Sequence, residues 1–516
     1  MTAHGDEMVL ILDFGGQYTQ LIARRVRELG VYSEVRRFDD ALETGDSTKV
    51  VAVILSGGPC SVYDDDAPRP STRVFELGVP VLGICYGMQW MMHHLGGEVE
   101  PAGDREFGPA VVQVGGARSR LFHGLDASQN VWASHADRVL RLADGFEVTA
   151  ASDAAPFAAV ENTDRALYGV QFHPEVVHTQ QGKEILHNFL FEIAGCSGEW
   201  SLKSFVEQAI EAIREQVGDE RVVCGLSGGV DSSVMALLLH RALGDRLTCI
   251  FVNNGVLRKG ESDQVLTSFR DGYHLDVRYA DEADRFLGRL AGLDEPEEKR
   301  KAIGETFIEV FESEARELGN IRFLAQGTIY PDRIESASVR GPSATIKTHH
   351  NVGGLPERME LELVEPLRDL FKDEVRQLGE VLGLSHEFVW RHPFPGPGLA
   401  VRILGEVTAE RVALLQAADA IFMDELRESG LYEKTAQAFV VLLPVKSVGV
   451  MGDFRTYENV VALRAVETSD FMTADWARLP PEFLSKVSGR IVNEVNGINR
   501  VVYDITSKPP GTIEWE

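Results

Sequence analysis

Cysteine is scarce in this chain, and its placement excludes two kinds of protein. The 516 residues include five cysteines, at positions 60, 85, 196, 224 and 249, and no two of them form a Cys-x-x-Cys pair. This odd, scattered set excludes a disulfide-rich secreted domain and gives no indication of a zinc site. The first residues also lack the basic and apolar segments of a secretory leader, so we expect a protein of the reducing cytoplasm.

Positive charge and long apolar runs are missing as well. The 51 lysines and arginines are outnumbered by 79 aspartates and glutamates, which gives a formal net charge of -28. A surface for nucleic acid or for an anionic membrane would need a basic face, so we expect neither partner. No apolar run approaches the ~20 residues that are needed to cross a bilayer.

The N-terminal part of the chain has instead an alternation of strand and helix patterns. Three continuous apolar runs predict buried parallel strands, at residues 9–12, 50–55 and 79–84. Residues 18–29 predict a helix that Gly30 ends. Later strand patterns are more typical of antiparallel pairing, at residues 111–114, 146–151 and 166–172. Because 516 residues are too many for one core, we expect this α/β pattern to be the first of several domains.

A second α/β pattern follows and ends at a proline-rich run. Its predicted elements are helix 202–217, strand 221–225, helix 232–243, strand 247–252 and helix 370–382. The prolines of residues 391–398 exclude a helix or a central strand there. A small α+β module comes next, with helix 409–428, strands 439–443 and 460–466, helix 482–495 and strand 500–505. The predicted domains are residues 8–197, 198–391 and 392–516.

One cysteine stands in a context that favours chemistry. Gly83-Ile84-Cys85-Tyr86-Gly87 lies between a predicted strand and a predicted helix. Glycines on both sides allow a tight elbow, as in the Gly-x-Ser-x-Gly turn with sulfur in place of oxygen. The N-terminus of a helix favours a thiolate, and backbone N–H groups there can hold an oxyanion.

A second string supplies the groups that a thiol nucleophile needs. His173 and Glu175 are two residues apart, so in an extended segment their side chains point the same way. A proton carrier with an orienting acid completes a catalytic triad. A lone cysteine is more often a small buried hydrophobic residue, but the elbow and the His-x-Glu string together favour catalysis. The other four cysteines keep the structural interpretation.

Residues 83–87 and 171–175 together resemble the class I glutamine amidotransferase family, over residues 8 to about 193. The resemblance implies that Cys85 is the nucleophile, His173 the base and Glu175 the orienting acid. It further implies that Gly58 and Tyr86 supply the oxyanion amides. Glutamine would be held by Gln89 and by His135 and Asp137 of the Ser134–Asp137 string. The family pattern has glycine where this chain has Ala136.

A glycine loop marks the second α/β pattern. The residues are Ser227, Gly228, Gly229, Val230, Asp231, Ser232 and Ser233, between a predicted strand and a predicted helix. Two consecutive glycines let N–H groups turn inward as an anion nest at the helix N-terminus. Asp231 could hold Mg²⁺ near the phosphates. The chain has no Gly-x-x-x-x-Gly-Lys-[Ser/Thr] string, which excludes a Walker-type loop.

This loop resembles the pyrophosphate-binding loop of the N-type ATP pyrophosphatases, which have an adenine-nucleotide α-hydrolase-like fold. That family cleaves ATP between the α and β phosphates and adenylates an oxygen of an acceptor. A lone Gly-Gly would be only a turn, but the seven-residue string between strand and helix is far more specific.

The order of the two domains and three C-terminal strings resemble the GMP synthase family. The strings are residues 348–351, 391–398 and 508–516. The resemblance implies glutamine, ATP with Mg²⁺, and xanthosine 5′-monophosphate (XMP) as small-molecule substrates and cofactor. It implies XMP contacts at Arg300, Gln437, Lys508 and Glu514. It also implies a homodimer formed through the C-terminal module, whose strands are apolar.

Other interpretations compete with this one. The charged run at residues 297–301 could be solvated, and the tail could be a frayed terminus, although its prolines and Trp515 favour docking. An enzyme with the same loop could make NAD, asparagine or a thiolated tRNA base. The first two normally use other kinds of glutaminase domain, and the third would show Cys-x-x-Cys pairs or a basic face. A degenerate amidotransferase acting as a binding module is disfavoured by the intact Cys85, His173 and Glu175.

Overall fold

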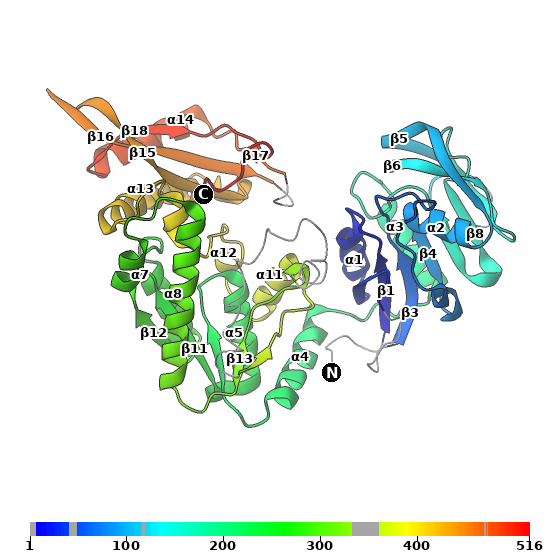
Figure 1. Ribbon diagram of the computed structural model, residues 1–516, viewed down its shortest axis with the longest axis horizontal. Helices are drawn as coiled ribbons and strands as arrows, with labels where there is room; N and C mark the ends of the chain where they lie inside the picture. The colour runs from blue at the N-terminus through cyan, green and yellow to red at the C-terminus, as the bar shows by residue number, and fades with distance from the viewer. Residues whose placement is uncertain are drawn as a thin grey trace. The chain divides into compact units, whose positions relative to one another are not determined.

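The chain forms two compact units, Met1–Ala212 and Ile213–Glu516. The structure is a computed structural model that describes residues 7–40, 49–115, 119–332, 361–451, 453–468, 471 and 473–516 (Figure 1). The string at residues 348–351 lies outside these described residues. Crossing a membrane would take a longer and more apolar helix than any found in the described ranges.

The first unit is built on one nine-stranded sheet, in the order β2-β1-β3-β4-β9-β8-β7-β5-β6. The strands are β1 (Glu7–Asp13), β2 (Ser33–Arg37), β3 (Lys49–Leu55), β4 (Val81–Ile84), β5 (Glu98–Val114), β6 (Ser128–Arg141), β7 (Glu147–Ala151), β8 (Ala159–Asn162) and β9 (Leu167–Val170). Neighbours from β2 to β9 run parallel, and those from β9 to β6 run antiparallel.

The apolar runs of this unit explain its parallel half. β1 and β4 are fully buried along their apolar residues, as a strand covered on both faces must be, which confirms the predicted parallel strands. β9 differs from the expected antiparallel pairing, because it pairs parallel with β4 on one side and antiparallel with β8 on the other. It is the strand at which the sheet changes direction.

The helices of the first unit are α1 (Thr19–Glu28), α2 (Tyr86–His94) and α3 (Gly182–His187), with a π-helical turn at Asn188–Ile193 and 3-10 turns at Thr72–Glu76 and Thr163–Arg165. The predicted helix at residues 18–29 is confirmed, and Gly30 ends it with a φ of 80°. α2 follows β4 directly, and it starts at the predicted elbow.

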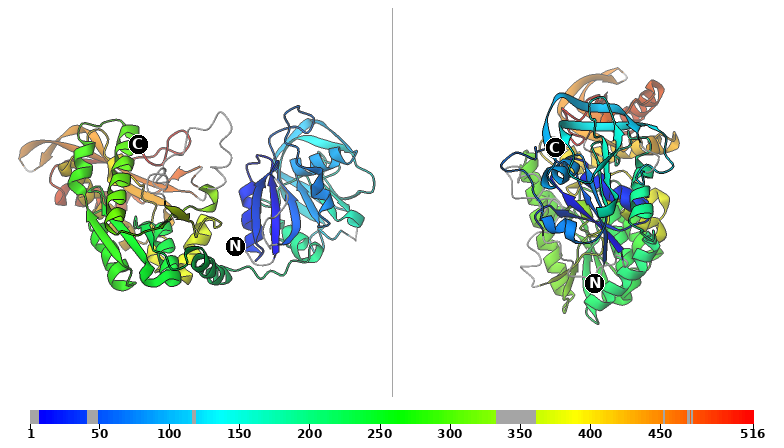
Figure 2. Two further views of the ribbon diagram at one scale, coloured as in Figure 1. Left: turned by 60° about the horizontal axis from the view of Figure 1, so that its bottom comes forward. Right: turned by 90° about the vertical axis from the view of Figure 1, so that its right-hand side faces the viewer.

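The second unit contains a five-stranded parallel sheet in the order β12-β11-β10-β13-β14 (Figure 2). Its strands are β10 (Val222–Gly225), β11 (Leu247–Asn253), β12 (Val277–Asp281), β13 (Phe323–Ala325) and β14 (Glu362–Val364). The boundary between the two units falls inside α4 (Leu202–Val217), after Ala212. The α-helices of this part of the second unit are α5 (Val230–Leu243), α6 (Glu261–Leu266), α7 (Ala283–Leu290), α8 (Pro296–Glu317), α11 (Lys372–Val381) and α12 (His386–Val389). The predicted α/β class is confirmed.

The rest of the second unit is a mixed sheet with two helices. The elements are α13 (Ala409–Glu428), β15 (Gln437–Met451), β16 (Phe454–Glu467), β17 (Asp475–Trp476), α14 (Pro481–Glu494) and β18 (Ile498–Tyr503). β15 and β17 pair antiparallel with β16, and β18 pairs parallel with it. The far end of the β15–β16 hairpin extends past α14 in Figure 1.

One apolar core joins the parallel sheet to this mixed sheet. It contains Val223 of β10, Phe286 of α7, Leu415 of α13 and Leu463 of β16, all completely or almost completely buried. The short 3-10 helix Gly398–Arg402, which begins at the last residue of the proline-rich run, contributes Leu399 to the same core. The domain boundaries at residues 8–197, 198–391 and 392–516 stay predictions.

Candidate active sites

The thiol of the first unit lies at a strained turn. Cys85 stands between β4 and α2 with φ 51° and ψ -108°, a backbone conformation that non-glycine residues rarely adopt. Its N–H donates to the carbonyl of Val170 on β9 at 2.8 Å, which holds the turn against the sheet. The residue is 5% exposed. The predicted nucleophile elbow is present at the end of a central strand.

The two flanking glycines serve this elbow by the space they leave. A Cβ atom on Gly83 would lie 2.6 Å from the backbone nitrogen of Met88, and one on Gly87 would lie 2.3 Å from the carbonyl oxygen of Leu55. Neither glycine has a positive φ, so the strain falls on Cys85 itself. The glycines let α2 start directly above the sheet.

The predicted proton carrier, His173, and its orienting acid, Glu175, are hydrogen-bonded to each other. Nδ1 of His173 lies 2.7 Å from Oε1 of Glu175, whose side chain is fully buried. Burial lowers the pKa of His173, but the charge of Glu175 and the hydrogen bonds to Cys85 and Glu175 outweigh it and raise the pKa above its ordinary value. The imidazole is therefore held as a cation, which is the partner that a thiolate needs.

The segment that carries this pair is fixed from several sides. The N–H of His173 donates to the carbonyl of Trp132 at 3.0 Å, and its carbonyl accepts from Oγ1 of Thr179 at 2.6 Å. The ring of Tyr18 meets the imidazole edge-on at 5.0 Å between centroids. Nε of Arg25, on α1, donates to the carbonyl of Glu175 at 3.1 Å. Tyr18 and Arg25 were not predicted, because they lie about 150 residues earlier in the chain and belong to no motif.

The two predicted oxyanion donors are neighbours. A Cβ atom on Gly58 would lie 3.3 Å from Cγ of Tyr86, the first residue of α2. A Cβ atom on Gly57 would lie 3.1 Å from Cε1 of His173 and 3.9 Å from Cβ of Cys85. The turn after β3 thus runs past the thiol and the imidazole, and Gly57 leaves the room between them.

The predicted glutamine contacts gather beside the thiol. Nε2 of Gln89 donates to the carbonyl of Asp137 at 2.9 Å and to Oε1 of Gln171 at 3.3 Å. Nε2 of Gln171 in turn lies 3.7 Å from Sγ of Cys85. The carboxylate of Asp137 accepts from Ser61 at 2.5 Å and from Tyr63 at 2.8 Å.

The remaining predicted contact, His135, is paired with an acid that was not predicted. Its Nε2 lies 3.1 Å from Oε2 of Glu106 on the neighbouring strand. Burial lowers the pKa of His135, although Glu106 opposes this. Ala136 alternates with its buried neighbours on β6 and is exposed, so its methyl group does not face them.

In the second unit, the predicted nucleotide loop joins β10 to α5. Gly228 has a φ of 73°, and Gly229 is the N-cap of the helix. The hydroxyls of Ser227 and Ser232 lie 2.9 Å apart, and the N–H of Ser227 donates to Ser232 at 3.2 Å. The loop therefore has a preformed shape. The hydroxyl of Ser233 is buried and has no hydrogen-bond partner among the described residues.

A lysine that was not predicted from the sequence contacts this loop. Nζ of Lys372, the first residue of α11, is 2.6 and 2.5 Å from the two carboxylate oxygens of Asp231. One turn later, Arg376 places a second positive charge near Asp231, although burial lowers the pKa of Arg376. In spite of the net charge of -28, the loop has a local basic environment. Within the described ranges, no three acidic, histidine or cysteine side chains gather into a metal cluster.

Two of the predicted XMP residues are in direct contact. Nε2 of Gln437 donates to Oε1 of Glu514 at 2.7 Å. The same carboxylate accepts two hydrogen bonds from Arg402, at 2.8 and 3.1 Å. The guanidinium of Arg402 is fully buried and stacks 4.1 Å from the ring of Phe439. Arg402 was not predicted.

The other two predicted XMP residues lie elsewhere along the tail. Nη2 of Arg300 donates to the carbonyl of Glu516 at 2.6 Å, and the neighbouring Lys299 is fully buried with its Nζ 2.5 Å from Oε2 of Glu516. The interpretation of these two residues as a solvated run is therefore wrong. Nζ of Lys508 donates to the carbonyl of Phe471 at 2.7 Å. The tail is docked and not frayed.

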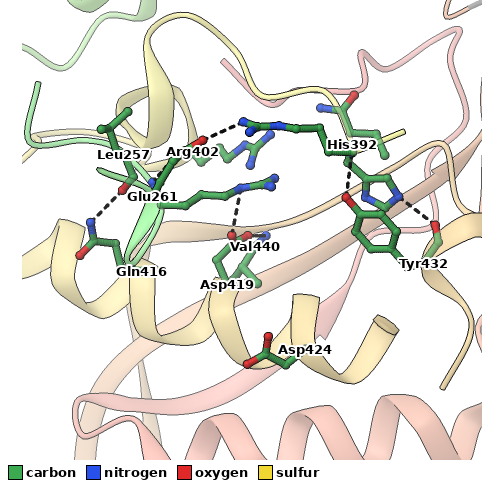
Figure 3. A network of polar contacts seen from close by, with 12 residues as sticks. Leu257, Glu261, His392, Arg402, Gln416, Asp419, Asp424, Tyr432 and Val440 are labelled. Atoms are coloured by element: carbon green, nitrogen blue, oxygen red, sulfur yellow. Dashed lines mark hydrogen bonds and ion pairs between the residues drawn. The ribbon is translucent and has the colours of Figure 1, made fainter. Parts of the chain in front are cut away.

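The proline-rich run is anchored by a polar network (Figure 3). Arg391 pairs with Glu261 of α6 at 2.8 Å, and His392 stacks on Tyr432 with 3.8 Å between ring centroids. Burial lowers the pKa of His392 to about 4, so this ring is neutral. Arg258 lies 3.5 Å from Asp419 of α13. The predicted absence of helix and strand is confirmed for residues 391–397, and the last residue of the run, Gly398, begins a 3-10 helix.

Three family descriptions match parts of the chain. Residues 10–193 match "Glutamine amidotransferase class-I", residues 201–272 match "NAD synthase", and residues 424–515 match "GMP synthase C terminal domain". The first contains the triad and the second contains the nucleotide loop.

Full-length relatives carry one name. A protein called "GMP synthase [glutamine-hydrolyzing]" from Phenylobacterium zucineum is 60% identical over 99% of this chain and 99% of its own length. Proteins of the same name from Carboxydothermus hydrogenoformans and Bartonella bacilliformis are each 58% identical. They cover 98% and 100% of this chain, and 99% and 100% of their own lengths.

Proposed function

Because this chain belongs to the glutamine-hydrolysing GMP synthase family, we propose which of its residues carry out each step of that reaction. The chain hydrolyses glutamine to glutamate and ammonia. It adenylates XMP with ATP, releasing pyrophosphate, and the ammonia then displaces AMP to give GMP. The first reaction belongs to the triad and the second to the nucleotide loop and the tail.

In the first reaction, Sγ of Cys85 attacks the amide carbon of glutamine. The oxygen that becomes negative is stabilised by the N–H groups of Gly58 and Tyr86. His173 gives its proton to the leaving ammonia, and a thioester remains on the sulfur. Water then adds to the thioester with His173 as base, which releases glutamate and restores the thiolate. Glu175, 2.7 Å from His173, keeps the imidazole oriented throughout.

Glutamine itself is held by Gln89, His135 and Asp137. Its α-ammonium and α-carboxylate groups need partners of opposite charge or strong hydrogen bonds. The support for this assignment is that Gln89 reaches Asp137, and through Gln171 the thiol, in one chain of contacts. His135 lies on the same strand as Asp137 and is buried like it.

The loop at residues 227–233 grips the pyrophosphate part of ATP. The N–H groups around Gly228 and Gly229 and the N-terminus of α5 favour an anion, and Lys372 and Arg376 add positive charge. Asp231 suits Mg²⁺, because this ion is commonly held by one or two carboxylates together with substrate phosphates. The ion would neutralise phosphate charge during adenylation.

XMP is held by Arg300, Gln437, Lys508 and Glu514, and its C2 oxygen is the atom adenylated. Three contacts support this assignment. The tail is docked, Gln437 donates a hydrogen bond to Glu514, and Arg300 donates one to the carbonyl of Glu516, two residues after Glu514. Lysine and arginine suit a nucleotide phosphate, and a carboxylate suits ring N–H groups or ribose hydroxyls.

We further propose a homodimer in the cytoplasm. The far end of the β15–β16 hairpin exposes large apolar side chains, with Val450 76%, Phe454 79% and Tyr457 65% exposed. Such side chains on a projecting hairpin fit a second copy of the same hairpin. The five cysteines are all free, which fits a reducing compartment.

The contact between the buried Glu175 and His173 next to Cys85 supports this proposal best. The test supplies the protein with glutamine, ATP, Mg²⁺ and XMP and follows GMP, AMP and pyrophosphate together. The three products should appear in equal amounts, and deamido-NAD in place of XMP should give no AMP. Amidation of deamido-NAD would contradict the assignment of the acceptor site.

A further inference from the structure

A second fully buried arginine, Arg464, lies beneath the tail. Arg464 is on β16, directly opposite Phe439 of β15. β18 pairs with β16 as far as Leu463, and β17 pairs with it from Val466. Arg464 therefore lies where the two partner strands leave a gap along that edge of the sheet, and the chain that leaves β18 passes this gap.

The alternation along the strands puts Arg464 on the face that the tail covers. Residues directly opposite each other in a sheet share a face, so Gln437, Phe439 and Arg464 point the same way. Ile513 of the tail packs with Phe439 on this face. The opposite face, with Leu463, belongs to the core shared with the parallel sheet. The guanidinium is thus enclosed between the sheet and the tail.

Among the described residues, the polar contacts of this guanidinium are made with residues 504–513, which follow β18 and lead into the tail. Nη1 donates to the carbonyl of Thr506 at 2.5 Å, Nη2 to Thr512 at 3.2 Å and Nε to Ile513 at 3.4 Å. Nη1 also lies 3.3 Å from Oδ2 of Asp504, which accepts the indole N–H of Trp515 at 3.0 Å. A buried cation is tolerated only when its donors are satisfied, so this arginine requires the tail in this conformation.

These contacts bracket Lys508. Thr506 precedes Lys508 and Thr512 follows it, so one guanidinium ties together both ends of the loop that carries the lysine. On its other side, the backbone of Lys508 pairs with Ala474, with N–O distances of 2.7 and 3.0 Å. The position of Lys508 is set from both sides, and Glu514 follows immediately after the last of the carbonyls held.

We propose that Arg464 is the positioning residue of the XMP site: it touches no substrate, and it shapes the loop so that Lys508 and Glu514 meet the nucleotide together. This inference rests on the proposed role of those two residues. Lysine in its place would keep the charge but would lose the planar fork that reaches three carbonyls at once. The expected effect is on binding of XMP, because the other sites do not depend on this loop.

The test compares Arg464→Lys with a matched control, Arg316→Lys, at an exposed arginine of α8. With saturating ammonia in place of glutamine, Arg464→Lys should raise the KM for XMP by about 10- to 100-fold and change kcat by less than about threefold. The KM for ATP and the glutaminase activity should not change. Arg316→Lys should behave as the unmodified protein. An unchanged KM for XMP in folded Arg464→Lys would overturn the proposal.

Substitutions of Lys508 and Glu514 themselves distinguish a failure of the proposed XMP site from a failure of the positioning role. If Lys508→Ala and Glu514→Gln leave the KM for XMP unchanged, the proposed acceptor site is itself wrong. If those two raise the KM for XMP and Arg464→Lys does not, only the positioning role is wrong.

Should Arg464→Lys be insoluble, Asp504→Asn removes one contact of the same guanidinium, and it should raise the KM for XMP by about 3- to 10-fold. Arg464→Ala should recover XMP binding when guanidinium ion is added and not when sodium is; a loss caused by general unfolding would show no such recovery.

Discussion

Nδ1 of His173 lies 2.7 Å from Oε1 of Glu175, and neither side chain is accessible to bulk solvent. A histidine cation in such a place is stable because the carboxylate is close and equally desolvated. The second carboxylate oxygen, Oε2, is buried without a hydrogen-bond partner among the described residues, so His173 is the main group that compensates the charge of Glu175.

This pair should make the stability of the amidotransferase unit depend on pH. The pKa of His173 is raised in the folded protein, so its stabilising contribution is fully present below the ordinary value near 6.5 and is lost as the pH rises through the raised value. Glu175→Gln removes the cause. The loss of melting temperature should therefore be largest near pH 6 and smaller near pH 9. An equal loss at both pH values would contradict a cationic His173.

Removal of the thiol should separate the two reactions. Cys85→Ala should abolish formation of GMP from glutamine, because no thioester can form, and it should leave formation from free ammonia largely intact. The two rates are measured on the same preparation with saturating ATP and XMP. If ammonia fails to support synthesis in the folded variant, the assignment of glutamine hydrolysis and GMP formation to separate sites is wrong.

Gly57 should be intolerant of a side chain. The methyl group of Gly57→Ala would lie 3.1 Å from Cε1 of His173 and would displace the imidazole. The imidazole would have to move by a few tenths of an ångström, and since a misplacement of about 1 Å can cost about 100-fold in rate, kcat for glutamine hydrolysis should fall by about 3- to 10-fold. Gly115→Ala, where a Cβ atom meets nothing within 4 Å, is the control and should retain full activity. Equal rates in the two variants would show that Gly57 borders no catalytic space.

Asp231 and Lys372 should both be needed for adenylation. Asp231→Ala and Lys372→Met remove the two partners of a contact on the nucleotide loop, and each should lower pyrophosphate release by about 100-fold or more. The rate of pyrophosphate release should fall by the same factor with glutamine and with ammonia, because XMP is adenylated before ammonia attacks it. Glutaminase activity measured alone serves as the control. Release of ADP and phosphate in step with GMP would contradict the assignment of the loop.

The parts of the site that can be predicted from the sequence are those formed by residues close together in the chain. The elbow at Cys85, the His173–Glu175 pair and the loop at residues 227–233 each lie within seven positions, and local backbone rules are enough to place them. Most of the strands and helices are predicted for the same reason, and α13 begins and ends at the expected residues.

The residues that were missed act across long separations in the chain. Arg402 meets Glu514 112 positions later, and Lys372 meets Asp231 141 positions earlier. Neither belongs to a motif, and an arginine or lysine in a sequence is more often a solvated charge. The parallel pairing of β9 with β4 was missed because a strand pattern does not reveal which neighbour lies on each side.

The core that runs from the parallel sheet into the mixed sheet has a consequence for how this chain melts. Phe286 and Leu463 belong to one apolar cluster, so the C-terminal sheet cannot detach without exposing the underside of the nucleotide-binding sheet to water. The residues from 213 onward should therefore unfold in a single calorimetric transition, and a ligand for either sheet should raise the temperature of that one transition. ATP and XMP would then stabilise the same cooperative block, even though their binding residues come from different sheets.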